Sequence, residues 1–275
     1  MKGRGRVLFA AVSHRAGRWY VALNVEAADL NDAARHRPST VEATGHVGVD
    51  LGLHAPAVAA AADGVEVGRF DHPRHLTAAM VKQVRLARAV TRKQKGSSNR
   101  QKAAARLGRR HQKISNRRHH ALHQVANAIS RYPRVALEDL NVAGMLGNHQ
   151  LARAISDAAW AELGRMLIYK QQWRGGRITV VDRWFPSSKT CSSCGAIDPG
   201  LTLGQRTYQC RACGLTLDRD LNAAINLAAW ADAHAARDRE ATGPDTNARG
   251  EERSDRHVRV GATILGEAGT RHAAA

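Results

Sequence analysis

Apolar and polar positions along the chain follow periods that predict a mixture of strands and helices. Two segments with alternating apolar residues, 7–13 and 19–25, predict a hairpin closed by residues 14–18. Short apolar runs bounded by glycine, proline or charged residues predict further buried strands. These runs lie at 46–52, 56–62, 65–70 and 135–140, and the first three predict a meander.

Between the third and fourth of these runs, the periodicity changes to that of a helix. Met80, Val84, Ala87 and Val90 recur at helical spacing, and a second apolar series extends from Leu107 to Ile129. The polar sequence at 96–99 interrupts the pattern. We therefore expect two antiparallel helices. Further helices are expected around Trp160 to Trp173 and from residue 221, with Leu221, Ile225 and Ala228 facing the core.

Charge changes the interpretation of the two antiparallel helices. The formal net charge of the chain is +18, and residues 71–134 hold 17 Lys and Arg against one acid. A run of charge is often only a solvated helix face, but this run is long and nearly free of acids. It favours contact with the phosphates of a nucleic acid. The candidate residues are Arg85, Arg88, Arg92, Lys93, Lys95, Arg100, Lys102, Arg106, Arg109, Arg110, Lys113, Arg117 and Arg118.

All four cysteines lie within 23 residues. Cys191-x-x-Cys194 and Cys210-x-x-Cys213 are each followed by glycine, Gly195 and Gly214. Two such turns converge on a tetrahedral Zn²⁺ in a zinc ribbon, and a site with four protein ligands is structural. The alternative is two disulfides or four buried thiols. No apolar run approaches the ~20 residues of a membrane span, and no secretory signal core is present. We therefore expect a cytoplasmic protein, where disulfides are rare.

Three acids stand at the ends of apolar elements. Asp50 lies inside the run at 46–52, Glu138 lies toward the end of the run at 135–140, and Asp220 lies where the helix after the cysteines begins. Carboxylates from two strands and a helix start can hold two Mg²⁺ ions, which support phosphodiester hydrolysis. Each acid also has a simpler explanation: a turn residue, a surface acid, or, for Asp218 or Asp220, a helix cap.

Several motifs together resemble the TnpB family, the RNA-guided endonucleases of insertion sequences, which are related to type V CRISPR effectors. Three of them resemble the nuclease motifs of that family: 49–52 (Val-Asp-Leu-Gly), 138–141 (Glu-Asp-Leu-Asn) and 218–224 (Asp-Arg-Asp-Leu-Asn-Ala-Ala). Segments 92–99, 156–160, 169–170 and 184–191 are also similar, so the resemblance extends over about residues 7–232.

The resemblance implies an α/β protein: an RNase H-like (RuvC) nuclease domain with a basic helical-hairpin insertion and an inserted zinc ribbon. It implies an Mg²⁺-dependent DNA endonuclease with Asp50, Glu138 and Asp220 as catalytic metal ligands and Asp218 as a helix cap. DNA and a guide RNA are the implied partners, and structural zinc and catalytic magnesium the implied cofactors. In such proteins pairing with the guide reads the sequence, while the protein holds the duplex by its shape and backbone.

On this basis the chain divides into seven segments. They are a remnant of a wedge β-barrel (1–42), a first RuvC-like nuclease segment (43–70), the basic helical insertion (71–132), a second RuvC-like nuclease segment (133–188), the zinc ribbon (189–215), the last nuclease helix (216–234) and a disordered tail (235–275). Most of the barrel and a helical recognition segment of the family have no counterpart here. This departure indicates either a truncated gene or a start further upstream.

Two other functions are compatible with the sequence. One is a protein that binds nucleic acid through the basic helices and the zinc ribbon without cutting it. The three acids Asp50, Glu138 and Asp220 argue against this, because a protein that only binds has no use for them. The other is an inactive remnant.

Overall fold

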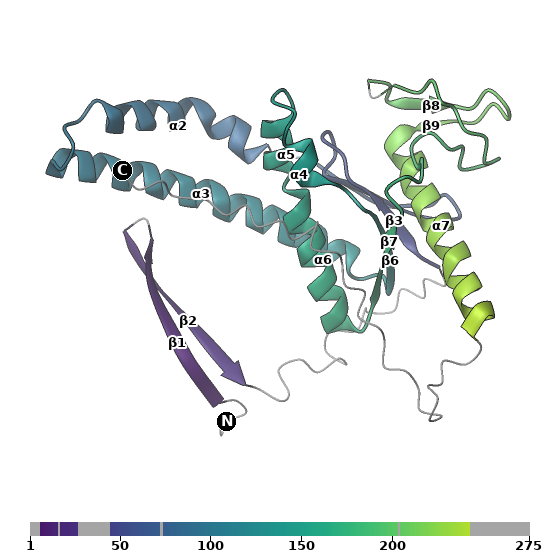
Figure 1. Cartoon of the computed structure of the whole chain (residues 1–275), viewed down its shortest axis with the longest axis horizontal. Helices are drawn as coiled ribbons and strands as arrows, with labels where there is room; N and C mark the ends of the chain where they lie inside the picture. Colours follow the sequence, from purple (N-terminus) through teal and green to yellow (C-terminus); the bar gives the residue numbers. More distant parts are fainter. Residues whose placement is uncertain (1–5, 16, 27–44, 72–73, 203, 243–275) are drawn as a thin grey trace. The chain divides into compact units, whose positions relative to one another are not determined.

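The computed structural model describes residues 6–15, 17–26, 45–71, 74–202 and 204–242 (Figure 1). The chain divides into two compact units. The first comprises Met1–Arg37 and Pro73–Gln124, and the second comprises Pro38–His72 and Val125–Ala275. Because the second unit holds both segments on either side of the basic helices, those helices form an insertion between two stretches of one domain.

The first unit contains the expected hairpin. Strands β1 (Arg6–Arg15) and β2 (Arg18–Glu26) pair antiparallel. Gly17 has φ 78° in the connection, a backbone conformation that favours glycine. Apolar side chains on this two-stranded ribbon are largely exposed, including Phe9 at 59% and Trp19 at 74%. An isolated hairpin of this kind is marginally stable in water, so these side chains form a surface suited to further packing.

The basic segment forms the two expected helices, α2 (His75–Thr91) and α3 (Ser98–Ile129). The last turn of α3, residues 125–129, belongs to the second unit. The polar turn between them contains Gly96 with φ 82°. The Arg100 guanidinium donates to the carbonyl of Lys93 at 3.2 Å. The side chains of Gln83 and His111 meet at 3.0 Å. These contacts hold α2 and α3 side by side in opposite directions (Figure 1).

A five-stranded mixed sheet forms the centre of the second unit. Its strands are β3 (Val47–Asp50), β4 (Ala57–Ala61), β5 (Glu66–Phe70), β6 (Arg134–Glu138) and β7 (Arg177–Val181). They lie in the order β5-β4-β3-β6-β7. The meander β3–β4–β5 is antiparallel, whereas β3 pairs with β6 and β6 with β7 in parallel. The carboxyl ends of β3, β6 and β7 therefore share one edge of the sheet.

Helices cover both faces of the sheet. Helix α7 (Arg219–Thr242) lies on one side, and α6 (Trp160–Arg174) lies on the other, preceded by α4 (Val142–Met145) and α5 (Ala152–Ala158) (Figure 1). The mixed α/β fold expected from the sequence is thus confirmed. Helix α7 continues through Thr242, beyond residue 234, where we expected the helix to end; residues 243–275 lie outside the described residues. None of the described helices is long and apolar enough to cross a membrane.

Helix α7 packs on the sheet through two apolar clusters. Ala224 and Ile225 pack with Val58 and Ala60 of β4. Leu227 and Ala231 pack with Ala136 of β6 and Val181 of β7. These α7 residues recur at helical spacing and are almost fully buried. The clusters define the face of the sheet that looks toward α7.

Helix α7 and β3 come into backbone contact at Gly48. A Cβ atom at this position would meet the carbonyl oxygen of Ala224 and would lie 2.5 Å from the amide nitrogen of Ala228. Gly48 therefore faces α7, and its neighbours Val47 and Val49, both buried, face the opposite side of the sheet. Only glycine allows the helix to approach this closely.

Candidate metal centres and nucleic-acid interface

The four cysteines form two matching turns. In each turn, the amide of the first cysteine donates to a carbonyl five residues on: Cys191 to Ala196 and Cys210 to Leu215, both at 2.8 Å. Gly195 and Gly214, with φ 75° and 78°, allow the chain to reverse beneath the sulfurs. The glycines after the cysteine pairs thus have the conformational role that the sequence predicts.

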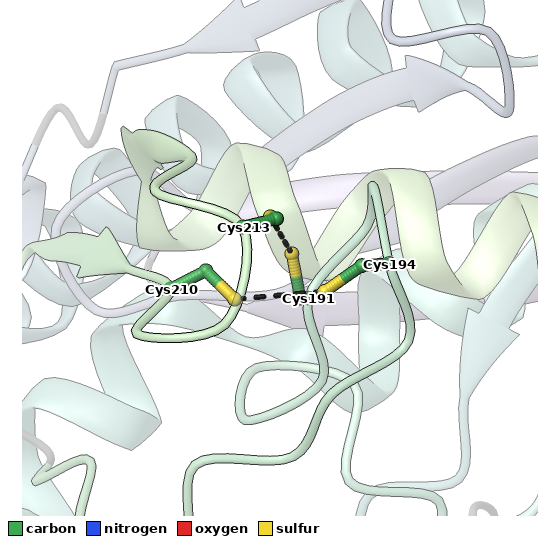
Figure 2. Close-up of side chains that lie close together, drawn as sticks. All are labelled: Cys191, Cys194, Cys210 and Cys213. Atoms are coloured by element: carbon green, nitrogen blue, oxygen red, sulfur yellow. Dashed lines mark hydrogen bonds between the residues drawn. The ribbon is translucent and has the colours of Figure 1, made fainter.

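The four sulfurs converge on one point (Figure 2). All four lie within 4.8 Å of one another, and the Cys191–Cys213 and Cys194–Cys210 pairs are each 3.6 Å apart. An ideal ZnS₄ tetrahedron with Zn–S of about 2.3 Å spaces its sulfurs about 3.8 Å apart. A disulfide needs about 2.05 Å, and all four cysteines are free. The site therefore fits structural Zn²⁺, and the disulfide alternative is excluded for this fold.

The backbone around the second turn favours a thiolate. Amide hydrogen bonds from Cys213 and Ala212 lower the pKa of the Cys210 thiol to about 6. Amides that point at sulfur stabilise the charged form, which is the form that binds metal. Tyr208 lies beneath the cluster, almost fully buried, and its hydroxyl donates to the carbonyl of Lys189 at 3.3 Å. Strands β8 (Thr207–Gln209) and β9 (Thr216–Asp218) pair antiparallel on either side of the second cysteine turn.

Two asparagines of α7 fasten the cysteine unit to the helix. The Asn222 amide group donates to the carbonyl of Thr190 at 2.7 Å and accepts from the amide of Ser192 at 3.0 Å. Asn226, one turn later, donates to the carbonyls of Thr190 at 2.6 Å and Ser187 at 2.8 Å. Both side chains are buried. The first cysteine turn is therefore bonded to the portion of α7 that carries Asp220.

Asp50 and Glu138 occupy matching positions on neighbouring parallel strands. Gly48 pairs with Ala136 and Val49 with Leu137, so Asp50 and Glu138 are the next residues along both strands. Since side chains alternate along a strand, Asp50 faces the same side as Gly48, and Glu138 the same side as Ala136. Both of those residues face α7. The two carboxylates therefore lie at one edge of the sheet on the α7 side.

Asp220 approaches this edge from the first turn of α7. An added Cβ on Gly52, two residues after Asp50, would lie 3.6 Å from Asp220 Oδ2. Asp220 is 6% exposed, and its Oδ1 pairs with the Arg219 guanidinium at 3.0 Å. The fold thus brings the three acids predicted from the sequence to one place from three separate segments of the chain.

The acids affect one another electrostatically. Burial raises the pKa of Asp50 well above its usual value, and the charges of Asp220 and Glu138 raise it further. Burial also raises the pKa of Glu138, with a contribution from Asp139. A site that disfavours the charged form of its own carboxylates is one in which a cation would be stabilising.

The cluster suits hard cations in its chemistry. Carboxylate oxygens are ligands for Mg²⁺. Among the described residues, the four cysteines form the group of three or more close metal ligands, and the three carboxylates are not part of such a group.

Asp218 has a different role from Asp220. Its Oδ1 accepts from the amides of Asp220 at 3.1 Å and Leu221 at 3.0 Å, which caps the start of α7. The same oxygen accepts from the Arg69 guanidinium of β5 at 3.1 Å. Asp218 is thus committed to the helix start and to β5.

Near its middle, α7 is tied to the start of β3 through Asp232. The buried His46 ring contacts Asp232 Oδ1 through Nδ1 at 2.7 Å and Thr179 of β7 through Nε2 at 3.0 Å. The amide of His46 also donates to Asp232, at 2.8 Å. Polar groups thus hold α7 at its start and near its middle, and the apolar clusters hold it to the sheet in between.

The candidate phosphate-binding residues lie on α2, α3 and the turn between them. Ten of the thirteen are exposed; Arg100, Arg110 and Arg118 are partly buried. Arg100 contacts the backbone of the turn, so it contributes to the hairpin itself. The exposed residues form a strongly cationic surface within the first unit, as the sequence predicts. Such a surface can neutralise phosphates without reading bases.

Several residues that build this site were not identified from the sequence. They are Gly48, His46, Arg219, Asn222, Asn226 and Asp232. A glycine inside a predicted strand signals a close approach, and two asparagines four apart share one helix face. The partners of these residues lie 30 to 186 positions away or depend on the packing of the fold. The sequence therefore contains these signals but does not indicate which residues they contact.

Comparisons with known proteins find two family models that match separate stretches of this chain. A family profile described as OrfB_IS605, a probable transposase, matches residues 23–149. A second, described as a Cas12f1-like TNB domain, matches residues 160–227. A protein of Streptomyces pristinaespiralis, named as a candidate RNA-guided DNA endonuclease, is 41% identical over 216 residues, which are 78% of this chain and 50% of that protein. A similarly named Escherichia coli K12 protein, InsQ, is 31% identical over 241 residues, 82% of this chain and 57% of that protein.

A solved structure supports the fold. The cryo-EM structure of the Cas12f1–sgRNA–target DNA complex superimposes with a TM-score of 0.52 and 17% sequence identity, over 79% of this chain and 55% of that chain. At this identity the likeness concerns the fold alone. The chain spans about half the length of the curated relatives it matches.

Proposed function

Because the chain belongs to the TnpB family, whose members described above are named as candidate RNA-guided DNA endonucleases, we propose that it carries the DNA-cutting centre of such an enzyme. The centre is formed by Asp50, Glu138 and Asp220. In the complete assembly a guide RNA selects the DNA strand, and this portion of the protein hydrolyses the phosphodiester.

One observation carries the proposal. Asp50 and Glu138 stand at the same level on paired parallel strands and face α7, whose first turn brings in Asp220. Nothing in the packing of the sheet needs three acids at this edge, and burial penalises their charges. A nuclease centre explains their position. The order β5-β4-β3-β6-β7, with helices on both faces, is consistent with an RNase H-like (RuvC) arrangement.

The carboxylates have a defined task in this mechanism. They would hold two Mg²⁺ ions, which would supply activation of a water molecule and stabilisation of the leaving oxygen. Arg219 offsets some of the negative charge through its ion pair with Asp220. Asp218 keeps the start of α7 in place.

The remaining segments position the nucleic acid and the helix. We assign residues 71–132 as the insertion that lies along the guide–target duplex, through the exposed cations of α2 and α3. The Zn²⁺ ribbon of residues 189–215 fixes the beginning of α7 through Asn222 and Asn226. Residues 43–70, 133–188 and 216–234 form the nuclease domain, and the β1–β2 hairpin belongs to the wedge barrel of the family.

The experiment compares two neighbouring acids. The full chain is incubated in excess with an end-labelled single-stranded DNA in Mg²⁺ or in EDTA. We expect slow cutting by the wild-type chain in Mg²⁺, none in EDTA, and none by Asp220→Asn or Glu138→Gln. Asp218→Ala is the matched control: it loses a helix cap, costs about 1 kcal/mol of stability, and still cuts.

Two results would contradict the proposal. One is the absence of cutting by the folded wild-type chain in Mg²⁺ while it binds the same DNA, which would favour a protein that only binds nucleic acid. The other is cutting by Asp220→Asn together with loss of cutting in Asp218→Ala. This result would show that Asp218, and not Asp220, is the metal ligand.

A further inference from the structure

Trp184 is an exposed aromatic residue in a region where its neighbours are packed. Its side chain is 84% exposed. The other tryptophans of the second unit are engaged: Trp160 is buried, Trp173 stacks edge-on against Tyr169, and Trp230 stacks on His234. A large indole ring left in water forgoes the burial that normally stabilises a fold. Trp184 therefore contributes little to folding through packing.

The backbone around Trp184 is nevertheless held in place. The amide of Trp184 donates to Asp182 Oδ1 at 2.7 Å, and the amide of Phe185 donates to the Asp182 carbonyl at 3.0 Å. The Phe185 ring packs beside Trp230 of α7. On the other side, the Arg183 guanidinium pairs with Asp139 at 2.7 Å. The loop thus presents the indole outward from a fixed position.

This position lies at the edge of the sheet that carries Glu138. Strand β7 ends at Val181, which pairs with Glu138 of β6. Arg183 then contacts Asp139, the residue that follows Glu138. Trp184 is therefore attached to the same edge of the sheet that carries Asp50 and Glu138.

From this arrangement we infer that Trp184 is a stacking platform for one unpaired base of the nucleic-acid strand that crosses the acidic edge. The inference rests on the proposed function. A strand positioned for hydrolysis places its phosphate at the carboxylates, so its bases extend to the side, where a fixed aromatic face can receive one. Stacking on an aromatic ring suits any base, which fits an enzyme in which pairing elsewhere supplies the sequence. The net charge of +18 favours a polyanionic partner over an apolar one.

The experiment measures binding without cutting. The full chain is titrated into a fluorescein-labelled single-stranded oligonucleotide in buffer without Mg²⁺, at about 0.2 M salt to weaken phosphate contacts on the basic helices. We expect Trp184→Ala to weaken binding by about 5- to 100-fold, the range for loss of one stacked base. Trp184→Phe, which keeps an aromatic face, should retain most of the affinity. Because the side chain is exposed, thermal unfolding of Trp184→Ala should match wild type.

Three controls make the result specific. An oligonucleotide with abasic sites keeps its phosphates but offers no base, so Trp184→Ala and wild type should bind it equally. The duplex of the same sequence should also show no difference. Trp173→Phe, a partly exposed tryptophan on α6, should bind the single strand like wild type.

The inference is overturned if Trp184→Ala binds the ordinary single strand as tightly as wild type, or loses the same factor on the abasic strand. Loss of binding to vesicles of anionic lipid, with unchanged oligonucleotide binding, would also overturn it. Because the assay contains no Mg²⁺, its outcome is independent of the cutting assay. A stacking effect without cutting would contradict the proposed function alone, and cutting without a stacking effect would contradict this inference alone.

Discussion

The Gly48→Ala substitution tests the packing that brings Asp220 to the other two acids. The new Cβ would lie 2.5 Å from the amide nitrogen of Ala228 and 3.0 Å from Leu227 Cβ, and closer still to the Ala224 carbonyl oxygen. The first and last of these atoms belong to the backbone of α7 and cannot move by changing a rotamer. An ordinary contact needs about 3.5 Å, so the helix must recede from β3 by about 1 Å or more.

The expected cost follows from this displacement. Overpacking of a core site costs about 1–3 kcal/mol, and the upper end of this range applies because backbone atoms are involved. Replacing glycine by alanine also reduces the conformational entropy of the unfolded chain, which stabilises the folded state by about 0.5–1 kcal/mol. We therefore expect a net loss of about 2 kcal/mol, measured as a lower midpoint of urea unfolding. A displacement of about 1 Å at the reacting groups reduces cutting by about 100-fold.

Gly164→Ala is the matched control for this prediction. Gly164 lies inside α6, and a Cβ added there would meet no atom within 4 Å. The same chemical change should therefore stabilise the protein by about 0.5–1 kcal/mol and leave cutting unchanged. Our reasoning is refuted if Gly48→Ala unfolds at the wild-type midpoint and cuts at the wild-type rate.

Three further predictions concern the two metal centres and the basic helices. Cys191→Ser removes one of four ligands, so elemental analysis should find the zinc of the purified protein lost, and the protein should unfold at lower temperature; full zinc content would contradict the structural site. Replacing Arg106, Arg109 and Lys113, all exposed on α3, with alanine should flatten the log–log slope of duplex DNA affinity against salt by about 2–3 units, and an unchanged slope would mean only a solvated face. Without added Mg²⁺, Asp50→Asn should stabilise the fold at pH 7, and with Mg²⁺ it should abolish cutting; the pKa of Asp50 is raised in the folded state, so its ionisation costs stability as pH rises, and the gain should vanish below pH of about 4, as urea unfolding at both pH values would measure.

The sequence predicted the features of the molecule that depend on neighbouring residues. The cysteine turns follow from spacing and from glycines that adopt positive φ, and both are local properties. Strands β1 to β6 and the basic helices follow from periodicity and from the polar turn at 96–99, whereas β7, β8 and β9 were not predicted. The role of Asp218 as a cap was implied by the family resemblance, and the hydrogen bonds agree with it.

The remaining features depend on distant partners. The alignment of Asp50 with Glu138 requires the register of two strands 88 residues apart, and periodicity does not contain that register. The buried contact of His46 with Asp232 joins residues 186 positions apart. Arg219 is adjacent to Asp220 in sequence, but its ion pair depends on a side-chain conformation set by packing. Sequence reasoning placed the acids and left their supports unidentified.

The position of α7 in the chain also determines when the three acids can come together during synthesis. A nascent chain leaves the ribosome from its N-terminus, so β3 and its Asp50 emerge first, and β6 with Glu138 follows only after the basic helices. The apolar face of the sheet is covered only when Leu227 and Ala231 of α7 have been made, and Asp220 belongs to the same helix. In a chain still being translated, the cationic helices α2 and α3 are therefore available to bind RNA before all three acids can come together.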